Sequence, residues 1–157
     1  MSQQDFGHLG ETALKALGRG LAALVENGDT ILLEGPVGAG KSTFARALIS
    51  HCLAKENRTE DIPSPTFTLV QTYELEQMVI WHADLYRLGD ASEVIELGLS
   101  DAFQNSVCLI EWPEIMAELQ PKDALYLRLS HAEDDRHLVA KWVDEKWTAK
   151  IAAVLQR

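Results

Sequence analysis

The chain has 157 residues, of which 46% are hydrophobic and 24% are charged. This length and composition suit one soluble globular domain and exclude a collagen-like, coiled-coil or wholly disordered chain. The longest apolar runs, residues 21–25 and 151–155, are too short for a transmembrane helix, and the polar N-terminus predicts no signal peptide. Cys52 and Cys108 lie in apolar surroundings and are expected to be buried thiols of a cytoplasmic protein without membrane contact.

Charge is distributed unevenly along the chain, whose formal net charge is −10. Residues 61–120 contain 11 acidic residues and a single base, Arg87, and they account for the whole acidic excess. Because phosphate contacts need clustered Lys and Arg, such a chain is a poor independent binder of nucleic acid. The acidic stretch is either a solvated face or a docking surface for a protein partner.

Hydrophobic periodicity and turn residues predict the secondary structure. In chain order, the expected elements are a helix over 14–25 that ends at residues 27–29, a strand at 30–34, a glycine-rich turn at 35–40, a helix at 42–54, a break at 62–65, a hairpin of strands 67–75 and 78–83, a helix at 91–97, a strand at 107–110, two strands around 125–129 and 138–142, and a helix over 147–155. This order predicts an α/β protein with a mixed sheet flanked by helices. No linker divides it, so residues 1–157 are expected to form one domain.

The turn after the first predicted strand has a specific chemical pattern. Residues 35–42, Gly-Pro-Val-Gly-Ala-Gly-Lys-Ser, match the G-x-x-x-x-G-K-[ST] pattern of a phosphate-binding loop, or P-loop. Gly38 and Gly40 let successive N–H groups converge on phosphate oxygens, and the dipole of the following helix points at the same place. Lys41 would place its charge on the β- and γ-phosphates, and the Ser42 hydroxyl would ligate Mg²⁺. A P-loop NTPase-like fold is therefore expected.

Other segments bear on the nucleotide and the metal. A GTPase would be expected to carry an Asn-Lys-x-Asp motif, and its absence from the sequence favours ATP. A carboxylate at the tip of a neighbouring buried strand usually completes the Mg²⁺ site, and both Glu111 and Asp84 follow such runs. At least one of them is expected to serve the metal, and the other could orient or polarise the attacking water.

Five further residues carry weaker signals. His82 is interpreted as structural rather than catalytic. Trp112 is expected to pack at the edge of the core, with contact to the nucleotide as the alternative. Arg46, Arg87 and Arg136 could stabilise phosphate charge, although such residues are more often surface ion pairs.

Four motifs occur in one order along the chain: Gly38-Ala-Gly-Lys-Ser-Thr43, Ser64-Pro-Thr-Phe67, His82-Ala-Asp-Leu-Tyr-Arg87 and Ile110-Glu-Trp112. Together they resemble the TsaE (YjeE) family of small bacterial P-loop ATPases, which are needed for the threonylcarbamoyladenosine (t6A) modification of tRNA. The resemblance covers nearly the whole chain. It implies an ATPase that uses ATP and Mg²⁺, acts with the TsaB and TsaD proteins, and meets tRNA only indirectly through them.

The resemblance also implies roles for individual residues. Ser42 and Glu111 match the Mg²⁺ positions, Asp84 matches the catalytic acidic residue, and residues 64–66 match a switch-like segment near the γ-phosphate. Lys41 would act with Asp84 in catalysis. The implied nucleotide-binding residues are Thr12 on the adenine side, Gly38, Ala39, Gly40, Lys41, Ser42, Thr43 and Arg136.

The chain departs from the family pattern in two places. Many relatives carry Asp-Leu where this chain has Pro36-Val37, and Thr where it has Ser42. Ser42 keeps the hydroxyl that metal binding needs, whereas Pro36 removes one backbone donor at the start of the loop.

Two other functions are compatible with a P-loop: a small-molecule kinase, and a nucleotide-dependent binding module with little turnover. A kinase usually has an arginine-bearing lid, and the single base Arg87 in residues 61–120 argues against one. Assays of phosphate release and of phosphate transfer would separate the three functions.

Overall fold

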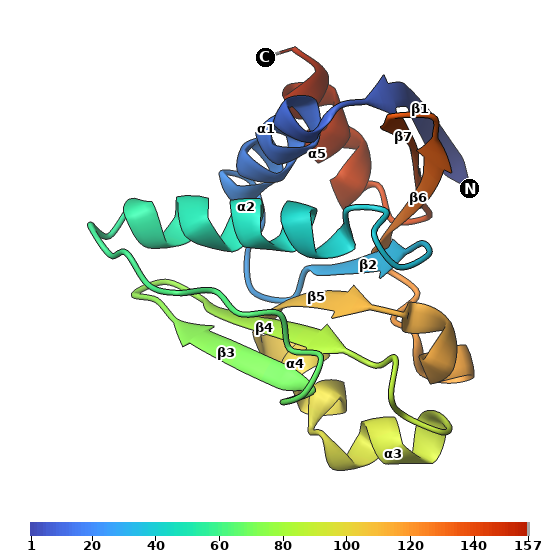
Figure 1. The fold of residues 1–157 in the computed structure, drawn as a ribbon. Coiled ribbons are helices and arrows are strands. Elements are labelled where there is room, and N and C mark those ends of the chain that lie inside the picture. Colours follow the sequence, from blue (N-terminus) through green and yellow to red (C-terminus); the bar gives the residue numbers. More distant parts are fainter. Residues whose placement is uncertain (157) are drawn as a thin grey trace.

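The computed structural model describes residues 1–156, which form one seven-stranded mixed sheet with helices on both faces (Figure 1). The strands are β1 (Ser2–Leu9), β2 (Thr30–Glu34), β3 (Val70–Glu74), β4 (Val79–Asp84), β5 (Val107–Glu111), β6 (Leu125–Ala132) and β7 (Asp135–Trp142). The helices are α1 (Glu11–Ala22), α2 (Lys41–Ala54), α3 (Ala91–Glu96), α4 (Leu99–Asn105), the 3₁₀ helix η1 (Pro113–Leu119) and α5 (Lys146–Leu155). The mixed α/β fold expected from the sequence is confirmed.

The centre of the sheet is parallel. Its strand order is β1-β7-β6-β2-β5-β4-β3, and β2 pairs in parallel with both β5 and β6, while β4 pairs in parallel with β5. The carboxyl ends of β2, β5 and β4 therefore meet at one edge of the sheet, where ligands of open α/β proteins usually bind. Asp84 and Glu111 are register partners at this edge.

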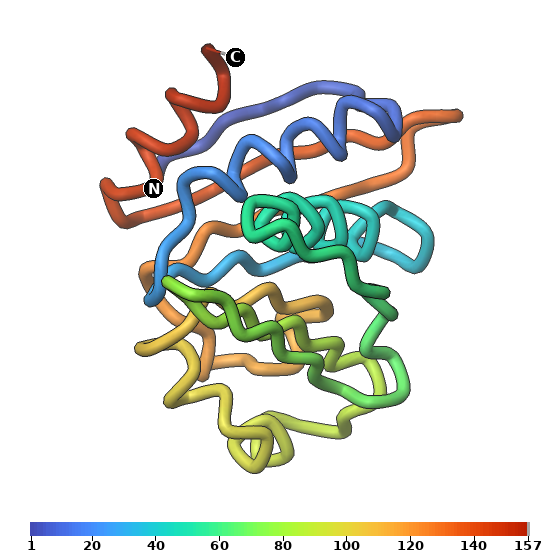
Figure 2. Tube along the Cα trace, turned by 90° about the vertical axis from the view of Figure 1, so that its left-hand side faces the viewer, coloured from blue at the N-terminus to red at the C-terminus, as the bar shows by residue number. Residues whose placement is uncertain are grey.

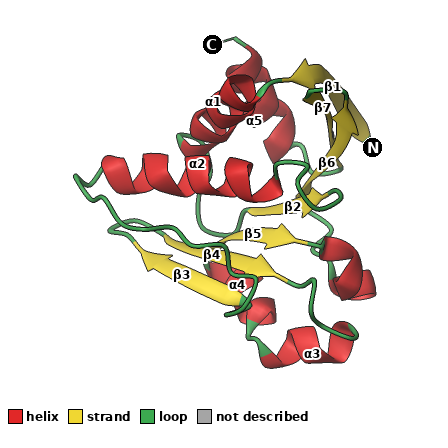
Figure 3. Cartoon of the chain, in the orientation of Figure 1, coloured by secondary structure: helices red, strands yellow, loops and turns green. Residues whose placement is uncertain are grey.

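The central strands are buried on both faces, which explains their continuous apolar runs. On one face, Ile31 and Leu109 pack in a core with side chains of α1, α2 and α5. On the other face, Leu32 and Ile110 pack with side chains of α3, α4 and η1. Figure 3 shows these two groups of helices on opposite sides of the yellow strands. The sheet is thus a rigid platform for the loops at its carboxyl edge.

Three elements were not expected from the sequence: β1, α4 and η1. Strand β1 lacks clear apolar alternation and forms because residues 2–9 pair antiparallel with β7, with a register shift between Asp5 and Gly7. Figure 2 shows β1 and β7, from opposite ends of the chain, side by side. The expected strand at 67–75 is wrong at its start, because residues 65–68 form a turn and Leu69, directly after it, has a positive φ of 69°. The first helix also ends earlier than expected, at Ala22.

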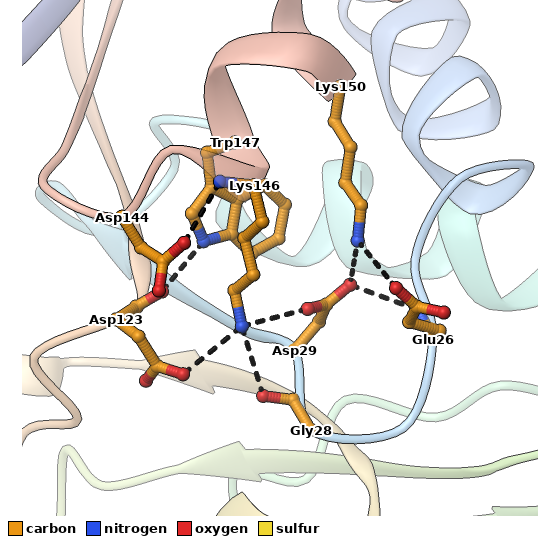
Figure 4. Close-up of polar contacts among 8 residues, drawn as sticks. All are labelled: Glu26, Gly28, Asp29, Asp123, Asp144, Lys146, Trp147 and Lys150. Carbon is orange, nitrogen blue, oxygen red and sulfur yellow. Dashed lines mark hydrogen bonds and ion pairs between the residues drawn. The ribbon is translucent and has the colours of Figure 1, made fainter.

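Helix α5 is anchored at the opposite, amino-terminal end of β2 (Figure 4). The Asp29 carboxylate, only 2% exposed, pairs with the ammonium groups of Lys146 and Lys150 and accepts a hydrogen bond from the Glu26 amide. The Trp147 indole N–H donates to the Asp123 carbonyl at 2.7 Å. These contacts hold the last helix against the α1–β2 turn. This turn lies at the end of β2 opposite the carboxyl edge of the sheet, where Asp84 and Glu111 lie.

Both cysteines are buried thiols, as expected. Burial raises the pKa of Cys52 to about 11 and that of Cys108 to about 12, so neither has the thiolate character of a reactive cysteine. Within residues 1–156, no helix is long and apolar enough to cross a membrane.

Candidate functional site

The glycine-rich loop, residues 35–40, connects β2 to α2 at the carboxyl edge of the sheet. Gly38 and Gly40 have φ values of 80° and 108°, which an L side chain rarely adopts, and a Cβ at Gly40 would lie 2.7 Å from Leu14 Cδ2. Gly40 is also the residue that precedes α2, so the free N–H groups of the first helical turn face the loop. The strand–loop–helix unit has the arrangement that the sequence pattern predicted.

A pocket of about 350 Å³ opens where this loop meets the ends of β4 and β5. Predicted site residues gathered in its wall are Gly38, Gly40, Lys41, Ser42, Thr43, Asp84, Glu111 and Arg136. Val37, Thr66, Tyr86 and Trp112 complete the lining. Residues from five separate parts of the chain therefore meet in one cavity.

Two predicted nucleotide-binding residues are not among those that line the pocket. Ala39 is fully buried beneath the loop, where a Cβ at Gly35 would lie 3.3 Å from its Cβ, and its expected contact with the nucleotide stays a prediction. Thr12 is exposed in the first turn of α1. The expected role of Thr12 on the adenine side stays a prediction.

Ser42 and Glu111 form the polar centre of the pocket. The Ser42 hydroxyl lies 3.0 and 3.1 Å from the two Glu111 carboxylate oxygens, and Glu111 is only 3% exposed at the end of β5. A hydroxyl beside a carboxylate is an oxygen donor set that suits Mg²⁺, which usually takes one or two protein carboxylates, water and phosphate oxygens. Within the described part of the chain, no group of three His, Cys, Asp or Glu side chains could hold a metal. The pair therefore fits Mg²⁺ bound together with a phosphate, rather than a closed protein cage.

His82 adds a contact that the sequence did not indicate. Its Nε2 lies 2.7 Å from Glu111 Oε2, and the ring is fully buried. The structural interpretation of His82 is thus incomplete, because its partner is a predicted metal ligand. The only signal in the sequence was its spacing, two residues before Asp84, which places both side chains on one face of β4.

Asp84 lies beside Glu111 at the end of β4 and is 5% exposed. Its carboxylate accepts hydrogen bonds from the Thr66 hydroxyl at 3.2 Å and from the Tyr86 backbone N–H at 3.0 Å. The Thr66 hydroxyl is also 2.9 Å from that of Ser64. The segment 64–66 is therefore tied directly to Asp84.

Lys41 is 5% exposed and turned toward the loop. Its ammonium donates a hydrogen bond to the Gly35 carbonyl and lies 3.5 Å from the centroid of the Trp112 ring. Burial lowers the pKa of Lys41, and the nearby carboxylates, Glu111 first among them, oppose that shift. Trp112 packs at the edge of the core that contains Leu32 and Ile110, as expected, and it also lines the pocket. Its contact with the nucleotide stays a prediction.

Of the three candidate arginines, Arg136 is the one in the pocket wall. A Cβ at Gly40 would lie 3.4 Å from Arg136 Nη1, which is buried and has no hydrogen-bond partner within residues 1–156. Arg46 lies instead in a groove between α1 and α2. Arg87 donates to the carbonyls of Thr66 and Phe67, at 3.4 and 3.3 Å, and so braces the segment next to Asp84.

The sheet order, the loop and the pocket define an α/β protein with a P-loop NTPase-like fold. Residues 9–139 match the family model described as "Threonylcarbamoyl adenosine biosynthesis protein TsaE". The chain belongs to the TsaE family of tRNA threonylcarbamoyladenosine biosynthesis proteins.

Individual proteins similar to this chain support the same family assignment. The TsaE protein of Rickettsia bellii is 38% identical over 82% of this chain and 87% of the relative. The TsaE protein of Bacillus subtilis is 34% identical over 86% of this chain and 82% of the relative. A crystal structure of Bacillus subtilis YdiB superposes with a TM-score of 0.79 and 25% identity, and the match covers 99% of this chain and 95% of that one. The likeness therefore extends over the whole fold.

Proposed function

We propose that this member of the TsaE family is an ATPase that binds ATP with Mg²⁺ and supports t6A synthesis together with TsaB and TsaD. The observation that carries the proposal is the pairing of Ser42 with Glu111 beside the N-terminus of α2. A helix N-terminus offers N–H donors to phosphate, and the hydroxyl and carboxylate offer oxygen ligands to a cation. ATP is favoured over GTP because the chain has no Asn-Lys-x-Asp motif.

Phosphate binding would use the loop and Lys41. The Lys41 ammonium is held by a neutral carbonyl and by an aromatic face, both of which are weaker partners than a phosphate. An incoming phosphate would therefore draw the ammonium toward itself, with the amides of residues 38–42 as further donors. Arg136 has an unpaired buried nitrogen next to Gly40 and would add a second positive charge.

Ser42 and Glu111 would hold Mg²⁺, which neutralises charge on the phosphates when it is bound. Asp84 would orient and polarise the attacking water, because its carboxylate is fixed by Thr66 and the Tyr86 amide beside the same pocket. The two carboxylates thus have different surroundings. Glu111 contacts Ser42 in the first turn of α2, and Asp84 contacts Thr66 of the 64–66 segment.

Partner docking would use the acidic stretch 61–120. Asp90, Glu93 and Glu96 lie at α3, which begins seven residues after Asp84. Asp90 caps α3 through the Ser92 amide, and the Glu93 carboxylate accepts from the Gly89 amide. A basic partner surface would be attracted to these groups, and tRNA would be held mainly by the partner proteins.

Calorimetric titration of ATP, with and without Mg²⁺, tests the binding step, and release of inorganic phosphate tests hydrolysis. Ser42→Ala should lose the Mg²⁺-dependent part of ATP binding. Ser50→Ala, at an exposed position eight residues further along α2, is the matched control and should bind as the wild type does. Mg²⁺-independent or absent nucleotide binding by the wild type, or equal effects of the two substitutions, would refute the proposal.

A further inference from the structure

His82 lies on the face of β4 that points toward α2 and the glycine-rich loop. In the register of the parallel pair β4–β5, His82 is opposite Leu109, and Asp84 is opposite Glu111. Leu109 belongs to the core shared with α1, α2 and α5. Because side chains alternate along a strand, His82, Asp84, Leu109 and Glu111 all project to this same side.

The contact between His82 and Glu111 has a defined direction. An ionised carboxylate can only accept hydrogen bonds, so His82 Nε2, 2.7 Å from Glu111 Oε2, must be the donor. The other ring nitrogen, Nδ1, is buried and has no hydrogen-bond partner in the described chain. The surroundings therefore favour the tautomer that carries its hydrogen on Nε2.

Glu111 receives donors from two sides. The Ser42 Oγ lies 3.0 Å from Glu111 Oε1 and 3.1 Å from Oε2. Its single hydrogen is therefore shared between the two carboxylate oxygens. His82 is a second donor to Oε2 alone. Oε1 has Ser42 as its only hydrogen-bond partner among residues 1–156. A carboxylate held at one oxygen in this way cannot rotate freely, and its other oxygen remains available.

We propose that His82 is a positioning residue: its Nε2–H fixes Glu111 so that the carboxylate is already oriented for a divalent cation bound with the nucleotide. This inference rests on the proposed function, because it assigns Glu111 to Mg²⁺. It goes beyond that function by giving a task to a fully buried histidine that is not among the residues lining the pocket. Outer-shell donors to metal ligands commonly change metal affinity by about 10- to 100-fold when they are removed.

Two substitutions of His82 that end in the same amide group test whether the residue positions Glu111 or only fills space in the core. His82→Gln keeps an amide N–H at about the reach of Nε2, whereas His82→Asn carries the same amide one carbon shorter. The readout is the Mg²⁺ concentration at half-maximal binding of a non-hydrolysable ATP analogue. We expect about a tenfold increase for His82→Asn and a value close to wild type for His82→Gln. Binding of the analogue without Mg²⁺ should be the same in all three proteins.

A second readout needs neither nucleotide nor turnover. Long-range ¹H–¹⁵N correlation spectra of the metal-free wild type should show the His82 hydrogen on Nε2. A hydrogen on Nδ1 alone would overturn the inference even if a variant failed to fold. Equal shifts of the Mg²⁺ midpoint in the two variants, or no shift in His82→Asn, would also overturn it and leave the proposed function standing. A wild type without Mg²⁺-dependent binding would refute both.

Discussion

The ammonium of Lys41 lies over the indole ring of Trp112, 3.5 Å from its centroid, while it also donates to the Gly35 carbonyl. Trp112 adopts a left-handed backbone conformation with φ of 60°, directly after Glu111. The Lys41 charge, which the proposed phosphate site would use, is thus held against neutral groups in a nearly buried position. Filling of the pocket would change the surroundings of both residues.

Lys41→Ala should abolish ATP binding without unfolding the protein. The side chain faces the pocket, and burial already lowers the pKa of its ammonium, so its loss removes a buried charge rather than a core contact. We expect at least about a 100-fold loss of affinity, corresponding to about 2.7 kcal/mol. Titration calorimetry and a thermal melt measure the two effects. Normal ATP binding and hydrolysis by the variant would rule out the P-loop function.

Glu111→Ala should weaken Mg²⁺-dependent nucleotide binding. The substitution leaves the Ser42 hydroxyl as the only protein ligand of the proposed cation and leaves the buried His82 Nε2 without its acceptor. ATP affinity should then respond little to added Mg²⁺ in a titration. An unchanged Mg²⁺ response would move the metal site to Asp84.

Asp84→Ala should still bind ATP and Mg²⁺ but hydrolyse ATP more slowly. General-base contributions are typically about 10²- to 10⁴-fold, so single-turnover phosphate release should fall by about 100-fold or more. The nearby Thr66→Val, which removes a hydrogen bond to Asp84 but keeps the carboxylate, should have a smaller effect. Loss of Mg²⁺-dependent binding in Asp84→Ala, with hydrolysis retained in Glu111→Ala, would exchange the two assignments.

Hydrolysis by the isolated protein should be slow and should rise when the TsaB–TsaD complex is added. Charge reversal of Asp90, Glu93 and Glu96 should reduce the stimulation, and so should added salt, because the attraction is electrostatic. The same reversal should not change basal turnover, since none of these residues lines the pocket. Full-speed hydrolysis without partners, or tight tRNA binding by the protein alone at physiological salt, would contradict this prediction.

The anchor of α5 predicts a loss of stability at high pH. Burial tends to lower the pKa of Lys146, but hydrogen bonds to Asp29 and Asp123 outweigh it, and the pKa is raised above its usual 10.5. Because its pKa is raised in the folded state, protonated Lys146 contributes its full stabilisation below about pH 10.5. That contribution is lost as the pH rises through the pKa of the folded state. Lys146→Ala should therefore show a smaller alkaline loss of unfolding free energy than the exposed control Lys122→Ala.

At neutral pH, removal of the buried partner should cost more than removal of either lysine. Asp29→Ala leaves two ammonium groups without their shared carboxylate, and breaking such buried pairs typically costs about 3–5 kcal/mol. Urea unfolding of Asp29→Ala, Lys146→Ala and Lys150→Ala measures the difference, and Asp123→Ala is the control, because Asp123 is about half exposed and should matter less. Equal stabilities would show that the Asp29 cluster does not anchor α5.

The sequence by itself determined the parts of the protein that depend on local geometry. The glycines and Lys41-Ser42 specify a loop and a helix start within a few residues, and the apolar runs before Asp84 and Glu111 place these carboxylates at strand ends. Such patterns are readable because backbone freedom and side-chain periodicity act over short distances. Four motifs in one order also sufficed to indicate the TsaE family.

Only the tertiary structure decided which distant residues share the pocket. Arg136 enters it because β7 pairs antiparallel with β6, and His82 reaches Glu111 because β4 and β5 pair in parallel in one particular register. Strand β1 forms only because β7 offers it a partner. Strand order and register arise from packing of the two cores against the whole sheet, and no local pattern in a single sequence contains that information.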